Sequence, residues 1–326
     1  MRAFSYAKPG TTSEALKILN EHRGQAAVLA GGTDLLSLMK DSVVSPAVVV
    51  NVKSISKLSG ISRQGRHLRI GATTTLTDLI EDSTVSSRYP SLVQAAEGVA
   101  SPQIRNMGTV GGDLCQRPRC WYFRGGFGLL ATHDGRSMVE DGDNRYHAVL
   151  GNAGPARFVN PSSLAPALIA LGAEVEISGP SGSRVIPLAD FFRTPQNEGE
   201  KEYVLGDNEL LMEVQVPLQE SSNATYEVRQ RQALDWPLAA AAVSLNMDGA
   251  TVRSASVVLG HVAPVPWVAT AAAEVLRGRT LSPDLARQAG EAATRGATAL
   301  SKNGYKIQLA RVAAARAILR ASETES

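Results

Sequence analysis

The chain has few of the features that mark several common classes of protein. It contains only two cysteines among 326 residues, which excludes a fold held together by many disulfide bonds. No apolar run reaches the roughly 20 residues that a membrane-spanning helix requires. The formal net charge of +2 is too small to indicate binding to nucleic acid or to an anionic membrane. The first residues also lack the apolar stretch of a secretory signal peptide, so we expect a cytoplasmic protein.

Motifs for acid–base or metal-dependent catalysis are missing as well. No Ser-His-Asp order, histidine-rich metal motif or pair of neighbouring carboxylates stands out. The histidines are scattered, and we expect each to lie at the surface or to serve packing: His22, His67, His133, His147 and His261. The Rossmann template G-x-G-x-x-G and the phosphate-loop template G-x-x-x-x-G-K-[ST] both fail.

Two diglycine segments are the most informative feature that is present. The first, Ala30-Gly31-Gly32-Thr33-Asp34, follows a short apolar run, and the second spans residues 108–113. Glycine lets a ligand approach the backbone, and successive N–H groups in such a turn form a concave site for an anion. Two such turns indicate a long ligand with a diphosphate, held from two sides. For each segment taken singly, a tight loop after a strand stays open as the alternative.

The length and the order of the elements predict two or three domains of mixed class. The chain is 44% hydrophobic and 20% charged, as is usual for a globular protein. Residues 11–14 fit a helix capping box, residues 219–223 form a polar break, and residues 115–145 are a long stretch with weak periodicity. The last third gives strands followed by helices, which is typical of an α+β domain. Strands are expected at 26–29, 47–50, 68–70, 146–150, 174–177, 211–216, 226–232, 239–247 and 252–260. A first helix is expected through residues 16–19, and further helices at 35–39, 75–81, 89–99, 164–171, 269–276, 286–294 and 307–319.

Taken together, the two glycine segments resemble a known family, the FAD-binding medium subunits of molybdenum hydroxylases of the xanthine dehydrogenase, aldehyde oxidoreductase and carbon monoxide dehydrogenase group. The Gln-Ile-Arg-Asn lead-in at residues 103–106 makes the second segment the most specific element. Residues 235–239 and the tail around Lys306 are also similar to the family's C-terminal domain. The resemblance covers essentially the whole chain. It implies an α+β protein of the FAD-binding, vanillyl-alcohol-oxidase-like fold, with two α/β subdomains at 1–55 and 56–220, and a C-terminal domain at 221–326 with a three-stranded sheet and helices.

The same resemblance implies which residues hold FAD. The first turn resembles the family's diphosphate cradle, and the second resembles the segment that passes the flavin end and the pyrophosphate. We expect Asp34 to cap the helix at Leu35, because a carboxylate would repel the phosphates. Ser101, Gln103 and Asn106 are expected either to contact the cofactor or to make turns. The implied cofactor-binding residues are Leu29, Ala30, Gly31, Gly32, Thr33, Asp34, Leu35, Ser101, Gln103, Asn106, Thr109, Gly111, Gly112, Asp113, Ser163 and Leu164.

Two of these positions depart from the family's pattern. Asp113 stands where relatives often have asparagine, and an ionised aspartate accepts hydrogen bonds but cannot donate them. Ser163 stands where relatives have a cofactor-contacting aspartate, in the stretch Pro161-Ser162-Ser163. Either serine fits the N-cap of the helix that follows, and we expect one of them to serve that role.

The stretch Cys-Gln-Arg-Pro-Arg-Cys at residues 115–120 resembles the extra loop of one branch, the periplasmic-type aldehyde oxidoreductases, in which four cysteines typically hold a [4Fe–4S] cluster. This chain offers only Cys115 and Cys120, so a cluster is not expected. The cysteines are instead expected to be reduced packing residues, with a disulfide between them as the alternative in an oxidising compartment. The nearby arginines, Arg117, Arg119 and Arg124, are expected either to face a partner's acidic surface or to be solvated.

The resemblance implies an oxidoreductase subunit of the aldehyde or xanthine dehydrogenase type, which passes electrons through FAD to an external acceptor. Its partners would be a large subunit with the molybdenum cofactor and a small subunit with [2Fe–2S] clusters, in a heterotrimer or its dimer. Co-export with a partner to the periplasm stays open. Two other functions also stay open: a stand-alone FAD-dependent oxidoreductase, and a non-catalytic assembly subunit that has lost FAD.

Overall fold

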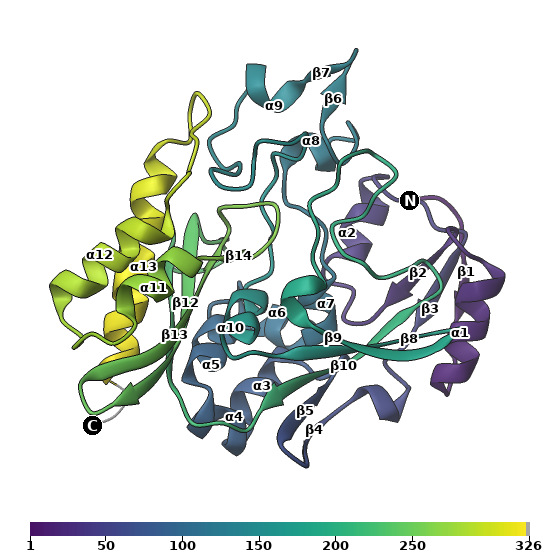
Figure 1. The fold of residues 1–326 in the computed structure, drawn as a ribbon. Coiled ribbons are helices and arrows are strands. Elements are labelled where there is room, and N and C mark those ends of the chain that lie inside the picture. The colour runs from purple at the N-terminus through teal and green to yellow at the C-terminus, as the bar shows by residue number, and fades with distance from the viewer. Residues whose placement is uncertain (324–326) are drawn as a thin grey trace.

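A computed structural model describes residues 1–323 as three units, each built on its own sheet (Figure 1). In the N-terminal unit, three parallel strands lie in the order β1-β3-β2. The predicted capping box forms, with Thr11 and Glu14 each bonding to the backbone at the start of α1. The elements of this unit are β1 (Ser5–Ala7), α1 (Thr12–Glu21), β2 (Ala26–Leu29), α2 (Leu35–Lys40) and β3 (Val48–Asn51).

The middle unit is a five-stranded antiparallel sheet in the order β4-β5-β10-β8-β9, with helices packed on it. Its strands are β4 (Ile61–Gln64), β5 (His67–Gly71), β8 (Glu174–Gly179), β9 (Gly182–Pro187) and β10 (Leu210–Pro217). Its helices are η1 (Ser56–Leu58), α3 (Leu76–Glu81), α4 (Ser83–Arg88), α5 (Pro90–Glu97), α6 (Pro102–Met107), α7 (Val110–Leu114), α10 (Leu164–Ala170) and η2 (Leu188–Asp190).

Strand β10 joins the cores of the first two units. Leu210 and Met212 pack with the core of the N-terminal unit, whereas Val214 and Val216 pack with the helices of the middle unit. The pairing of β10 with β8 shifts register between Leu211 and Glu213. The strand is therefore buried on both faces, and it fixes the N-terminal unit against the middle unit.

The C-terminal unit is an antiparallel sheet in the order β11-β12-β13-β14. Ala241 and Val243 of β12 pack with the C-terminal helices, while Ala242 packs with the core of the middle unit on the other face. Burial on both faces explains the unbroken apolar run in β12. The elements are β11 (Ser222–Val228), β12 (Ala239–Asp248), β13 (Thr251–Gly260), β14 (Trp267–Val268), α11 (Thr270–Leu276), α12 (Pro283–Ala293) and α13 (Tyr305–Glu323).

Residues 115–145 form an inserted segment with short elements of its own, at the top of Figure 1. They are α8 (Trp121–Arg124), the two-stranded ribbon β6 (Thr132–His133) and β7 (Arg136–Ser137), and α9 (Met138–Asp141). Phe123, Leu129 and Leu130 form a small apolar core with Leu38 of α2 and Phe158. The insertion therefore packs on the helix that follows the first glycine turn.

The α+β class is confirmed, and four details of the expected fold are wrong. No strand forms at 146–150, because the backbone amide of Ala148 bonds to the carbonyl of Arg157 while those of Val149 and Leu150 both bond to the carbonyl of Val262, which builds no ladder. The strand expected at 226–232 lies at Ser222–Val228, so the polar break before it is shorter than expected. The C-terminal sheet has a fourth strand, β14, and β1, β4 and β9 are strands that the sequence did not predict. Within residues 1–323, no helix combines the length and the apolar character of a membrane span.

Candidate functional site

Two neighbouring cavities lie where the two glycine segments meet. The larger has a volume of about 430 Å³, and the smaller has a volume of about 100 Å³. Five residues line both cavities and form the boundary between them: Thr33, Asp34, Thr109, Gly112 and Gln116. The structure thus brings both sequence motifs to one site, as a long ligand would require.

The first glycine turn packs directly against the second segment. A Cβ atom on Gly31 would lie 1.9 Å from the carbonyl oxygen of Met107, so only glycine fits there. Gly32 has φ +74°, a left-handed conformation that glycine adopts without steric cost. Both glycines line the larger cavity. They are therefore required by the close approach of the two segments and by the shape of the turn.

The backbone N–H groups of this turn are available to a ligand. Among residues 1–323, the amides of Gly31, Gly32, Thr33, Asp34 and Leu35 have no hydrogen-bond acceptor. Five successive donors without partners, in a turn that lines a cavity, suit an anion with several oxygen atoms. This observation fits the expected diphosphate cradle.

The second glycine segment differs from the first in how its backbone amides are bonded. Most of its amides are bonded within the protein: those of Val110 and Gly111 to the carbonyls of Thr74 and Ala72, between β5 and α3, and those of Gly112 and Asp113 to Thr109. Gly111 allows close packing, since a Cβ there would lie 2.9 Å from the oxygen of Ala72. The segment thus begins α7, with the Thr109 hydroxyl as its cap, and most of its amides are already occupied within the protein.

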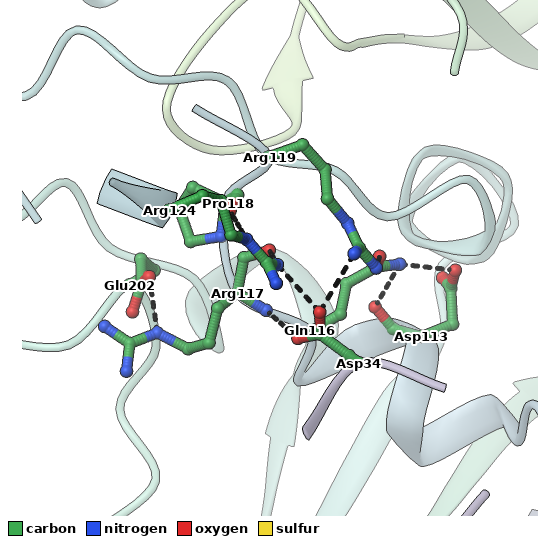
Figure 2. A network of polar contacts seen from close by, with 8 residues as sticks. All are labelled: Asp34, Asp113, Gln116, Arg117, Pro118, Arg119, Arg124 and Glu202. Atoms are coloured by element: carbon green, nitrogen blue, oxygen red, sulfur yellow. Dashed lines mark hydrogen bonds and ion pairs between the residues drawn. The ribbon is translucent and has the colours of Figure 1, made fainter. Parts of the chain in front are cut away.

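The expectation that Asp34 caps α2 is wrong. Its side chain makes no capping hydrogen bond. Instead, as Figure 2 shows, it accepts from the backbone amide of Arg117 at 2.8 Å and forms ion pairs with Arg119 at 3.0 Å and Arg124 at 2.7 Å. Arg117 in turn pairs with Glu202 at 2.8 Å. The charges of these three arginines are therefore paired within the chain.

Asp113 and Ser162 form a buried polar pair beside the smaller cavity. Ser162 donates its hydroxyl proton to Asp113 and also accepts from the amide of Ala165, so Ser162 provides the expected helix cap. The amide of Leu164 donates to Asp113 at 3.1 Å. Burial raises the pKa of Asp113 to about 6, although these hydrogen bonds oppose the rise.

A second buried carboxylate lies close to this pair. Glu227 of β11 pairs with Arg229, and its Oε1 atom has no hydrogen-bond partner among residues 1–323. Burial raises the pKa of Glu227 to about 7, although Arg229 lowers it. Ser163 lines the smaller cavity, and Glu227 lies behind that wall. Of these two buried carboxylates, Asp113 lines the smaller cavity together with Ser163.

Some predicted site residues lie away from the cavities. Ser101 caps α6, Asn106 accepts from Thr77, and Gln103 is exposed on α6. Leu29 belongs to β2, and Leu164 contacts the site only through its backbone amide. Of these residues, none lines either cavity.

Conversely, several cavity-lining residues were not predicted. Lys201 and Tyr203 line the larger cavity, and Arg119 and Trp236 line the smaller one. The Arg119 guanidinium lies 4.6 Å from the centre of the Trp236 ring. Arg119 and Trp236 lie in stretches that resemble the family, at 115–120 and 235–239, but neither was expected to contact the cofactor.

The two cysteines are free thiols in the structure, as the packing hypothesis expects. Cys115 packs against the core of the middle unit, and Cys120 lies with its sulfur 3.2 Å from Nε2 of His147. Burial raises the pKa of both thiols and lowers the pKa of His147 to about 4. Within the described part of the chain, no group of three or more His, Cys, Asp or Glu side chains is placed to hold a metal ion.

Comparison with known proteins agrees with this geometry. Residues 2–219 match the FAD binding domain in molybdopterin dehydrogenase, and residues 224–321 match the CO dehydrogenase flavoprotein C-terminal domain. The chain is 35% identical to the aldehyde oxidoreductase FAD-binding subunit PaoB of Escherichia coli K12, over 82% of this chain and 84% of that subunit. It is 30% identical to the carbon monoxide dehydrogenase medium chain of Hydrogenophaga pseudoflava, over 89% of this chain and 85% of that protein.

Solved structures give the same result. A carbon monoxide dehydrogenase from Hydrogenophaga pseudoflava aligns with a TM-score of 0.78 at 27% identity, over 99% of this chain and 98% of that one. Quinoline 2-oxidoreductase from Pseudomonas putida 86 also aligns with a TM-score of 0.78, at 26% identity, with the same coverage of both chains. The chain therefore belongs to the family of FAD-binding subunits of molybdopterin dehydrogenases.

Proposed function

We propose that this chain is the FAD-carrying electron-transfer subunit of a molybdenum-dependent hydroxylase or dehydrogenase. The observation that carries the proposal is the row of acceptor-free amides from Gly31 to Leu35, at the edge of a cavity that both glycine segments line. An oxidoreductase subunit of this type needs a site for a long anionic cofactor, and it needs no acid–base constellation of its own. Bound FAD would supply the chemistry of accepting two electrons and passing them on.

The residues of the site have separate tasks toward the cofactor. The amides of residues 31–35 would bind the diphosphate, and the Thr33 hydroxyl can add a donor. Thr109 accepts from Gly112, so its own hydroxyl proton is free to reach the ligand. Gly112 keeps the passage between the cavities open, since a Cβ there would contact only Thr109 within 4 Å. We thus propose Ala30 to Leu35, Thr109, Gly111 to Asp113 and Ser163 as the cofactor-binding set.

We further propose the partners, boundaries and compartment. The relatives' names include medium chains, which supports a large and a small partner subunit. The finer assignment is a large subunit with the molybdenum cofactor and a small one with [2Fe–2S] clusters. The three separate sheets support units at 1–55, 56–220 and 221–326. The two free thiols agree with a cytoplasmic location, with co-export by a partner as the alternative.

Two experiments test this function against its alternatives. Purified from its native host, the chain should accompany a molybdenum protein, and its flavin should be reduced by substrate only in that complex. Direct reduction of the flavin in the isolated chain would support a stand-alone oxidoreductase instead. A purified complex without flavin absorbance would mean that the chain has lost FAD, and the proposal would be wrong.

A further inference from the structure

The inserted segment contributes side chains to the cofactor site. Gln116 lines both cavities, Arg117 lines the larger one and Arg119 lines the smaller one. Figure 2 shows these residues beside Asp34, which follows the acceptor-free amides of the first glycine turn. The first part of the insertion, residues 115–124, therefore lies at the candidate site.

Asp34 fastens this segment and is neutralised by it. One of its carboxylate oxygens pairs with both Arg119 and Arg124, and the other accepts from the amide of Arg117. A free carboxylate at this position would repel a diphosphate bound to the neighbouring amides. Two guanidinium groups around one carboxylate remove that repulsion and leave an excess positive charge.

The three arginines differ in what holds them. Arg117 pairs with Glu202, and Arg124 also donates to the carbonyls of Arg117 and Pro118. These two arginines fasten the segment. Arg119 is held by Asp34, by the side-chain oxygen of Gln116 at 3.0 Å and by the ring of Trp236.

Arg119 therefore has contacts from the N-terminal unit, the insertion and the C-terminal unit around one small cavity. Its side chain is only 25% exposed, and its Nε has no partner among residues 1–323. Asp113 lines the same cavity and is linked to Arg119 through Gln116, so a cation and a carboxylate both face the space.

We propose that Arg119 is a cofactor-positioning residue supplied by the inserted segment, held by Asp34, Gln116 and Trp236 so that its guanidinium forms a wall of the smaller cavity. This inference rests on the proposed function, because the ligand it positions is FAD. Arg119 acts by charge and by orientation, since hydrogen bonds and ion pairs to charged groups are the stronger ones.

The test compares Arg119→Gln with Arg119→Lys in the full chain, purified with the partners that accompany it. We expect Arg119→Gln to weaken FAD binding about tenfold or more, because bonds to charged groups are worth more than neutral ones. It should also lower the flavin midpoint potential, because reduction adds negative charge that a nearby cation stabilises. Arg119→Lys keeps the charge and should restore most of the potential. Arg145→Gln is the matched control, because Arg145 pairs with Asp143 in the same insertion and lines neither cavity.

The outcomes are distinguishable. An Arg119→Gln complex with wild-type affinity and potential would overturn this inference alone. A loss of affinity with an unchanged potential and no rescue by lysine would assign Arg119 a merely structural role, and would overturn it too. A wild-type complex without FAD would refute the proposed function and this inference with it.

Should Arg119→Gln not fold, Trp236→Leu provides the second variant. It removes the stacked ring at a position that is 42% exposed and leaves each ion pair in place. Faster release of FAD than from wild type is expected, because the guanidinium loses one of its three supports. An unchanged release rate would count against the inference.

Discussion

Gly31→Ala tests the contact between the two glycine segments. The added Cβ would lie 1.9 Å from the Met107 oxygen, whereas real Cβ contacts stay above 3.0 Å, so the segments must separate by at least 1.1 Å (3.0 minus 1.9). The obstacle is backbone rather than a flexible side chain, and it cannot rotate away. Overpacking of this kind costs about 1–3 kcal/mol.

The cost should appear both in stability and in cofactor binding. We expect the free energy of unfolding to fall by about 1–3 kcal/mol. If part of that strain is relieved by moving the first turn, FAD binding should weaken by about 10- to 100-fold. Urea unfolding of the FAD-free chain and equilibrium dialysis with FAD measure the two effects.

Gly10→Ala is the matched control. Its Cβ would lie 3.7 Å from the nearest atom, a side-chain oxygen of Glu14, which is an ordinary contact. It belongs to the same unit as Gly31 and lines neither cavity. If Gly31→Ala keeps wild-type stability and FAD affinity, the close approach of the two segments is not what makes the site, and the reasoning is refuted.

Three further changes test other parts of the site. Burial raises the pKa of Asp113 from its ordinary value of 3.8 to about 6 in the folded protein, so the native state binds this proton more tightly and the free energy of unfolding falls as pH rises between these values. In Asp113→Asn, the free energy of unfolding measured with urea should fall less between pH 4 and 6 than in the wild type. An unchanged pH profile would contradict this. The double variant Cys115→Ala/Cys120→Ala should keep the iron and flavin content of the wild-type complex, whereas a loss of iron would reveal a cluster in this chain. Lys306→Met should lower the free energy of unfolding by about 1–3 kcal/mol, because the main-chain carbonyls of Tyr146 and His261 lose the ammonium as their donor, while that of His147 keeps Asn303. Thermal melting measures it, and a wild-type melting temperature would contradict it.

Local patterns predicted much of the fold. The capping box at Thr11 and Glu14 lies within one helical turn, so it could be recognised from neighbouring residues. The apolar run before Gly31 and the alternation around Val214 likewise gave β2 and β10. In each case the signal and the structure involve the same few residues.

The parts that failed depend on long-range contacts. Arg124 and Asp34 are 90 residues apart, and no periodic pattern indicates that a single acidic residue will pair with arginines of an insertion. Likewise, the buried run at 146–150 is apolar enough for a strand, yet the amides of Val149 and Leu150 both bond to the carbonyl of Val262, more than 100 residues away in the sequence. Whether each backbone amide of the two glycine turns is hydrogen-bonded within the protein also depends on how the turns pack, which their local sequence does not indicate.

The central claim is that the backbone amides of the first glycine turn bind the diphosphate of FAD. Hydrogen exchange of peptides that span residues 31–35, compared between FAD-loaded and FAD-stripped protein, tests it most directly. We expect these amides to exchange markedly more slowly in the loaded protein, because each then has an acceptor. Equal exchange in the two states, with protection by FAD confined to other segments, would contradict the account.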